Sequence, residues 1–369
     1  MLKEFKIRNF KSFKNEEILS LKPVDKNEEN LDPFNIANLG ENKILKSAVI
    51  YGHNSFGKSN LFKGLHKMIS IIRFCINSDY IIQVDDYKLD GISENKPTMF
   101  EISFILNNIV YTYGYEVFES LVVKEWLYKK DDLETKIFQR EGSLNNTITL
   151  NSKYKDYEKY VEFTKESELF LSSMEKNNVS GEIKDIFDYI SNKIKVFSID
   201  MVVEKKLGKN QILKTLKTVD LKVYGPEAKK EGEILENIIS DFEENEIVGS
   251  KKLYYIMDQI LDALNNGEVL FIDELDYKLN NLIVKYLIGL FHDLSINKKN
   301  AQLVFNTYDF YLLEEKLFRR DQIYFTDKDE YGVTTLYSLG DFKGVKRKTN
   351  LLAHYLAGHF GPIGNIKEK

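Results

Sequence analysis

The sequence predicts an α/β fold in which a mixed central sheet carries a phosphate-binding loop. A glycine-rich loop at residues 52–59 stands between an apolar segment and a segment with helical spacing. A second apolar segment, residues 269–272, ends in two acids, as expected for a buried parallel strand. Residues 100–117 alternate in polarity around two asparagines, which is typical of an antiparallel hairpin. Parallel and antiparallel strands with intervening helices indicate the mixed α/β class.

The loop reads Gly-His-Asn-Ser-Phe-Gly-Lys-Ser and fits the pattern G-x-x-x-x-G-K-[ST]. Residues 46–51 before it form a buried strand pattern, and residues 60–65 after it have helical spacing. The glycines let backbone N–H groups turn toward an anion, and the helix start adds a positive dipole end. We therefore expect a nucleoside triphosphate, with Lys58 at the β and γ phosphates and Ser59 on magnesium. The residues expected to contact the nucleotide here are Gly52, Asn54, Ser55, Phe56, Gly57, Lys58, Ser59 and Asn60.

The acids that follow residues 269–272 are Asp273 and Glu274. The carboxyl end of a central parallel strand faces the crevice in which α/β sheets bind phosphates. Phosphoryl transfer depends on positioning and electrostatics, so the pattern predicts that Asp273 holds magnesium and that Glu274 polarises the attacking water. Glu274 is the predicted catalytic residue.

Composition limits the classes of protein to consider. The chain has 369 residues, 43% hydrophobic content and a net charge of −5, which indicates a globular protein without an overall attraction to nucleic acid. Local basic clusters at residues 205–209 and 346–348 leave nucleic acid as an open alternative. The single cysteine, the absence of a signal-peptide pattern at the amino terminus and the short apolar run at residues 282–291 predict a cytoplasmic protein without a membrane span.

The great separation of Lys58 from Asp273 requires a large insertion between the two halves of the nucleotide site. ABC-type heads have such an insertion, and they place a glycine-containing signature at a helix start shortly before the acidic strand. Here Gly249 and Ser250 open a segment whose apolar residues at 253, 256, 260 and 264 share one helical face. This order of elements matches an ABC-type head.

The chain resembles the prokaryotic ABC-type ATPases of the RecF/SMC-related class. It is most similar to the smaller "AAA family ATPase" proteins of phage-defence operons, such as the Rlo-type, abortive-infection and PARIS ATPases. The segments that carry the resemblance are residues 5–13, 100–128, 319–339 and 355–361. The resemblance implies that Lys11 and Ser12 lie near the nucleotide, that Asp276 is the D-loop residue, and that Gln83 links magnesium to the head.

The chain also departs from the family at two positions. Ile247 stands where the signature commonly has a serine that contacts the γ-phosphate of the opposite head, and Tyr308 stands where the switch histidine is expected. A tyrosine can donate a hydrogen bond to phosphate but does not exchange a proton near neutral pH. We therefore expect binding of ATP and Mg²⁺ with slow hydrolysis.

The function that the resemblance implies is a nucleotide-controlled sensor or scaffold of an antiphage, abortive-infection-like system. Such a protein would associate head to head with itself and control a separately encoded effector, for which a nuclease is one candidate. The alternatives are a RecF-like ATPase of DNA repair or recombination, and an assembly protein that binds ATP without turnover. The sequence contains neither a nuclease constellation nor histidines and cysteines at zinc-ligand spacing.

Three regions follow from these patterns. Residues 1–130 form an amino-terminal ATPase lobe with the phosphate loop and a hairpin, residues 131–245 form a helical insertion or lid, and residues 246–369 complete the ATPase with the signature, the acidic strand and the family-type tail. Helical patterns occur at residues 154–169 and 180–194, but no heptad repeat is sustained, so no long coiled coil is expected.

Overall fold

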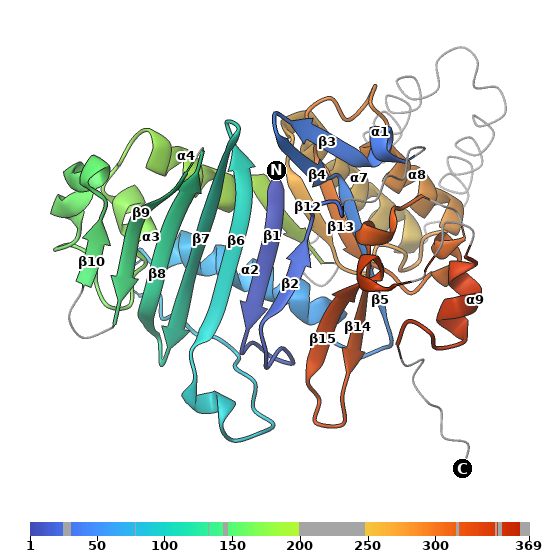
Figure 1. The fold of residues 1–369 in the computed structure, drawn as a ribbon, viewed down its shortest axis with the longest axis horizontal. Helices are drawn as coiled ribbons and strands as arrows, with labels where there is room; N and C mark the ends of the chain where they lie inside the picture. Colours follow the sequence, from blue (N-terminus) through green and yellow to red (C-terminus); the bar gives the residue numbers. More distant parts are fainter. Residues whose placement is uncertain are drawn as a thin grey trace.

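The computed structural model describes residues 1–361, except 25–30, 78, 132, 143–146, 199–247, 315–316, 344 and 346–348. Two large sheets lie side by side, and Figure 1 shows the antiparallel sheet next to the mixed sheet that carries the loop. The predicted α/β class with a mixed central sheet and an antiparallel subdomain is confirmed, and the described residues form no long coiled coil.

The antiparallel sheet has seven strands in the order β10-β9-β8-β7-β6-β1-β2. Its predicted hairpin is confirmed, because Asn107 and Asn108 both have positive φ angles of 51° and 64° and join two paired strands. Two asparagines with positive φ form the tight turn that suits the twist of a hairpin. The strands are β1 (Leu2–Arg8), β2 (Glu17–Ser20), β6 (Thr98–Leu106), β7 (Ile109–Phe118), β8 (Leu121–Lys130), β9 (Glu134–Glu141) and β10 (Thr147–Leu150).

The mixed sheet has six strands in the order β11-β12-β13-β5-β14-β15. The first five are parallel to their neighbours, and only β15 is antiparallel. Consequently the loop after β5 and the acids after β12 lie at the same edge of the sheet. The strands are β11 (Ile194–Phe197), β12 (Val269–Ile272), β13 (Gln302–Asn306), β5 (Ser47–Gly52), β14 (Ile323–Lys328) and β15 (Thr334–Ser338), and a separate pair is formed by β3 (Ile36–Leu39) and β4 (Asn42–Leu45).

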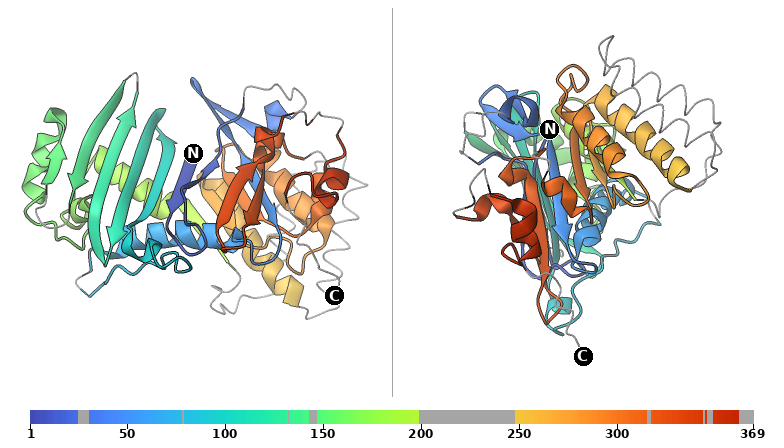
Figure 2. Two further views of the ribbon diagram at one scale, coloured as in Figure 1. Left: turned by 60° about the horizontal axis from the view of Figure 1, so that its bottom comes forward. Right: turned by 90° about the vertical axis from the view of Figure 1, so that its right-hand side faces the viewer.

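Helices cover both faces of the mixed sheet. Helix α2 (Lys58–Phe74) starts at the loop and runs along both sheets, contacting β5 of one and β1 and β6 of the other (Figures 1 and 2). Buried side chains of α7 (Val248–Asn266) and α8 (Asn281–His292) belong to a second core with β5, β12 and β13. The described residues also form α1 (Asp32–Asn35), α3 (Phe170–Lys176), α4 (Glu182–Asp188) and α9 (Leu351–Leu356). Among the described residues, no helix combines the length and apolar character required to cross a membrane.

The helical pattern predicted at residues 154–169 is only partly correct. A 3₁₀ helix, η2 (Ser152–Tyr160), takes its first half, and α3 begins just after its end. Tyrosines 154, 157 and 160 are spaced by three, so they line up on one side of a 3₁₀ helix. Their rings stack in sequence, with centroids 6.3 and 6.5 Å apart. The remaining short helices are η1 (Ser93–Asn95), the π-helical turn η3 (Tyr189–Lys193), η6 (Phe310–Leu313), η7 (Arg320–Gln322) and η8 (Leu339–Asp341).

The three predicted regions stay a prediction, but the described strands cross one of their boundaries. Strands β8 and β9 pair across position 130, so the first residues assigned to the insertion continue the antiparallel sheet. The predicted helix at 180–194 corresponds to α4 and the π-helical turn. The last part of the predicted insertion, residues 199–245, lies outside the described residues.

A buried glutamine joins the two sheets. Gln302, the first residue of β13, is 0% exposed, and its amide donates to the carbonyl oxygens of Leu2 and Leu45, at 2.9 Å each. Its side-chain oxygen accepts the Leu2 N–H at 2.6 Å. One side chain therefore satisfies backbone groups at the start of the antiparallel sheet and at the end of β4, away from water.

The Gln302→Leu substitution keeps the approximate volume but leaves three buried backbone groups without partners. We expect the free energy of unfolding to fall by about 2–4 kcal/mol, the scale of several unsatisfied buried groups. Urea denaturation followed by circular dichroism, without nucleotide, measures this change. Gln83→Leu is the matched control, because Gln83 is exposed and should lose almost nothing. Equal stability of the two variants would contradict the role of Gln302.

Candidate nucleotide-binding site

The phosphate loop connects β5 to α2 in a conformation that its glycines permit. Gly57 has a φ of 94°, and a Cβ there would collide with Thr334 and lie 2.9 Å from Ser12 Oγ. A Cβ on Gly52 would collide with Thr326. Both positions therefore require glycine, one for its backbone angle and both for the close approach of β14 and β15.

The lysine of the loop folds back onto the loop itself. Lys58 is 3% exposed, and its Nζ donates to the carbonyl oxygens of Gly52 at 2.6 Å and His53 at 3.2 Å. Burial lowers the pKa of Lys58 to about 8, and the nearby carboxylates Glu274, Asp273 and Asp276 oppose this decrease. An anion that reached the amine would favour its charged form.

The two halves of the predicted site meet directly. Ser59 Oγ donates to Asp273 Oδ1 at 2.9 Å, although the two residues are far apart in the sequence. The contact forms because β12 is separated from β5 only by β13, and all three strands end at one edge of the sheet. A hydroxyl and a carboxylate at this distance are the hard oxygen donors that Mg²⁺ prefers. The residues therefore fit a magnesium ion held by Ser59 and Asp273.

Asn306 forms hydrogen bonds with both acids, although no role was predicted for it from the sequence. Its Nδ2 donates to Asp273 Oδ1, and its Oδ1 accepts the Glu274 N–H at 2.7 Å. Glu274 has a φ of 55°, so this bond holds a left-handed residue at the point where β12 ends. The signal available in the sequence was the polar residue Asn306 at the end of β13, the strand next to β5.

The predicted D-loop and switch residues are in contact. The Tyr308 N–H donates to Asp276 Oδ2 at 3.0 Å, and the Tyr308 ring lies over the Lys58 amine, 4.0 Å from Nζ to the ring centroid. Burial raises the pKa of Tyr308, and the carboxylates of Glu274, Asp273 and Asp276 and a hydrogen bond with Glu274 raise it further. The phenol is therefore protonated near neutral pH.

The opening turn lies against the phosphate loop, as expected for Lys11 and Ser12. Ser12 Oγ accepts hydrogen bonds from Asn60 Nδ2 and Thr334 Oγ1, both at 2.8 Å. Lys11 has a φ of 50° and pairs with Asp85, with Nζ 2.7 Å from the carboxylate. The structure thus places Ser12 against the first turn of α2, and contact of Lys11 and Ser12 with a nucleotide stays a prediction.

The remaining predicted site residues are not brought into this cluster by a described contact. Gln83 is exposed, and its link to magnesium stays a prediction. Gly249 and Ser250 lie in the first turn of α7, but their side chains are outside the described part of the chain, as are Ile247 and both basic clusters. The signature therefore also stays a prediction. Asn54, Ser55 and Phe56 lie in the loop as predicted, and Ser55 has a φ of 67°.

The tail at residues 355–361 packs within this chain. The Tyr355 ring stacks on Phe325 of β14 with centroids 5.5 Å apart, and Phe360 stacks on the same ring at 5.7 Å. Tyr337 Oη donates to the Phe360 carbonyl oxygen at 2.7 Å. The tail therefore acts as a packing element against β14 and β15.

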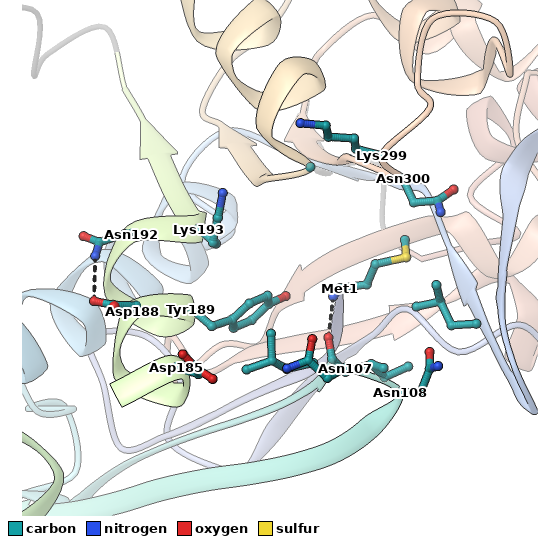
Figure 3. Close-up of a pocket in the computed structure, with 14 residues that line it drawn as sticks. Met1, Asn107, Asn108, Asp185, Asp188, Tyr189, Asn192, Lys193, Lys299 and Asn300 are labelled. Atoms are coloured by element: carbon teal, nitrogen blue, oxygen red, sulfur yellow. Dashed lines mark hydrogen bonds between the residues drawn. The ribbon is translucent and has the colours of Figure 1, made fainter. Parts of the chain in front are cut away.

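A pocket of about 650 Å³ lies at the opposite edge of the mixed sheet (Figure 3). Its lining includes Lys193, Gly267 and Asn300, which come just before β11, β12 and β13. The phosphate loop and the acids, in contrast, come after the ends of β5 and β12, at the other edge of the sheet. This pocket is therefore separate from the nucleotide site.

The fold and the cluster around Ser59 and Asp273 define a nucleotide-binding ATPase. Its α/β architecture combines a mixed sheet with an antiparallel sheet, as the sequence predicts. Residues 47–180 match the family model described as "AAA domain, putative AbiEii toxin, Type IV TA system". This match begins with β5 and includes the whole phosphate loop.

Among solved structures, the chain is similar to the SMC head domain from Thermotoga maritima. The sequence identity is 13%, the alignment covers 91% of this chain and 98% of that chain, and the TM-score is 0.37. Comparison with curated proteins gives no match. The assignment of the nucleotide site therefore depends on the geometry around Ser59 and Asp273 and on the family match that contains the loop.

The Asn306→Asp substitution tests the described arrangement of the acids. It replaces an amide donor by a third carboxylate next to Asp273 and Glu274, and like charges at this separation repel. We expect Asn306→Asp to be less stable than Asn306→Ala by about 1–3 kcal/mol in the absence of divalent cations. Millimolar Mg²⁺ should raise the melting temperature of Asn306→Asp more than that of the wild type. Identical melting curves of the two variants in chelator would contradict this arrangement.

Proposed function

We propose that this protein is an ATP-binding, slowly hydrolysing ABC-type ATPase that acts as a nucleotide-controlled sensor or scaffold of an antiphage system. The observation that carries the proposal is the Ser59 to Asp273 contact, which joins the loop and the acidic strand into one site. The proposal includes a separately encoded effector whose release or restraint depends on the bound nucleotide.

The residues of the site have distinct roles in this proposal. Lys58 and the loop N–H groups bind the β and γ phosphates, and Ser59 and Asp273 hold a magnesium ion that neutralises phosphate charge when bound. Glu274 orients and polarises the attacking water. Asn306 keeps Glu274 in place through the Glu274 N–H and is therefore a positioning residue.

Slow turnover follows from the two departures at Ile247 and Tyr308. The lost γ-phosphate donor at Ile247 and the altered switch at Tyr308 each raise the barrier by about 1–3 kcal/mol in this proposal. Because 1.36 kcal/mol is about a factor of ten in rate, two such losses slow hydrolysis by roughly 30-fold or more. A long-lived ATP-bound state suits a protein whose control of an effector depends on the bound nucleotide.

The defence role is supported by the name of the matching family and by the resemblance in the tail. The family description includes a putative AbiEii toxin and a Type IV toxin–antitoxin system, which are abortive-infection terms. We extend this role to the present chain together with head-to-head self-association, because an ABC-type signature acts on nucleotide held by a second head.

Two substitutions test the proposed ATPase. Lys58→Ala should abolish binding of Mg-ATP in isothermal titration, because it removes the amine at the phosphates. Glu274→Gln should keep ATP binding, stop phosphate release and trap an assembly that elutes earlier in size-exclusion chromatography with ATP. Lys63→Ala is the matched control, since Lys63 is an exposed lysine on the same helix.

Several results would contradict parts of this proposal. Undiminished ATP binding by Lys58→Ala would exclude the assigned site, and an elution volume of Glu274→Gln that ignores ATP would exclude nucleotide-driven association. Wild-type turnover above the enzyme median of about 10 s⁻¹ would exclude slow hydrolysis. Hydrolysis that DNA stimulates with a steep salt dependence would support the RecF-like alternative instead.

A further inference from the structure

Tyr308 makes a contact that its expected switch role does not explain. Its ring lies over the Lys58 amine, with the centroid 4.0 Å from Nζ. The ring therefore covers the group that is expected to bind phosphate.

The Lys58 amine has no free side left for an anion in this arrangement. An ammonium group has three N–H donors, and two of them are used by the carbonyl oxygens of Gly52 and His53. The face of an aromatic ring attracts a cation, so the Tyr308 ring takes the remaining approach. A phosphate oxygen must come within hydrogen-bond distance of the same amine, and therefore the ring must leave before phosphate binds.

Hydrogen bonds hold the backbone at Tyr308 in place. Its N–H donates to Asp276 Oδ2, and Thr307 next to it is buried and donates its own N–H to the Ile50 carbonyl oxygen at 3.3 Å. The side chain is 38% exposed and is not a member of either hydrophobic core. The ring can therefore rotate toward solvent while the backbone stays in place, and its position over Lys58 is not required by core packing.

We propose that Tyr308 is a removable cap of the nucleotide site, which occupies the phosphate side of Lys58 until a triphosphate displaces it. This proposal rests on the proposed ATP-binding function and adds to it a competition between the ring and the nucleotide. The ring and the phosphates approach the same side of the Lys58 amine, so each excludes the other.

Two substitutions separate the ring from the hydroxyl. Tyr308→Leu keeps an apolar side chain without an aromatic face, so we expect Mg-ATP to bind about 2- to 30-fold more tightly, the range of a cation–π contact. Tyr308→Phe keeps the ring and loses the phenol, so its affinity should change less. Tyr311→Leu is the matched control, since Tyr311 is 66% exposed on the same segment.

The experiment measures binding of Mg-ATP by isothermal titration, and thermal melting verifies that each variant is folded. Binding by Tyr308→Leu that is equal to or weaker than wild type would overturn the cap. Equal tightening by Tyr308→Phe and Tyr308→Leu would also overturn it, because the ring would then not be the group that competes with phosphate.

Failure of the cap and failure of ATP binding give different results. If the wild type binds Mg-ATP and Tyr308→Leu binds it equally, the cap is wrong and the ATP site stands. If neither protein binds Mg-ATP, both proposals fall. If Tyr308→Leu binds Mg-ATP and the wild type does not, the cap is supported, because the ring then prevents binding completely.

Discussion

The parallel alignment of β5, β13 and β12 is the constraint on which the site depends. Because parallel strands end at one edge of a sheet, the loop after β5 and the acids after β12 are brought together without any local sequence relation. Asn306 at the end of the strand between them completes the contact by bonding to Asp273 and to the Glu274 backbone. A change of strand order would remove the site even if every residue in it were kept.

The antiparallel sheet contacts the part of the mixed sheet at which the site lies. The opening turn that follows β1 places Ser12 against Asn60 of α2 and Thr334 of β15. Gln302 joins the start of β1 to β13 at the other end of the strands. Hydrogen bonds thus join the two sheets at both ends of their strands. The mixed sheet carries the candidate nucleotide site, and the antiparallel sheet supports it.

The sequence predicted the parts of the structure that local pattern determines. The loop at 52–59, the hairpin at Asn107 and Asn108, and the strands that precede the loop and the acids are all found where the patterns place them. The stacked tyrosines of η2 were not distinguished from an α-helix, because spacings of three occur in both. Asn306 and the ring of Tyr308 over Lys58 were missed for another reason: each role depends on which strands are neighbours, and spacing along the chain does not reveal this.

Helix α2 gives the loop a mechanical connection to the rest of the molecule. Its 17 residues form a rod of roughly 25 Å, with Lys58 and Ser59 at one end. Farther along, the Met68 carbonyl accepts from Tyr115 Oη at 3.1 Å, and the Ile72 carbonyl accepts from Ser172 Oγ at 2.7 Å. Both partners belong to the antiparallel half of the molecule. Helix α2 therefore joins the phosphate loop to the antiparallel half of the molecule as one continuous, hydrogen-bonded element.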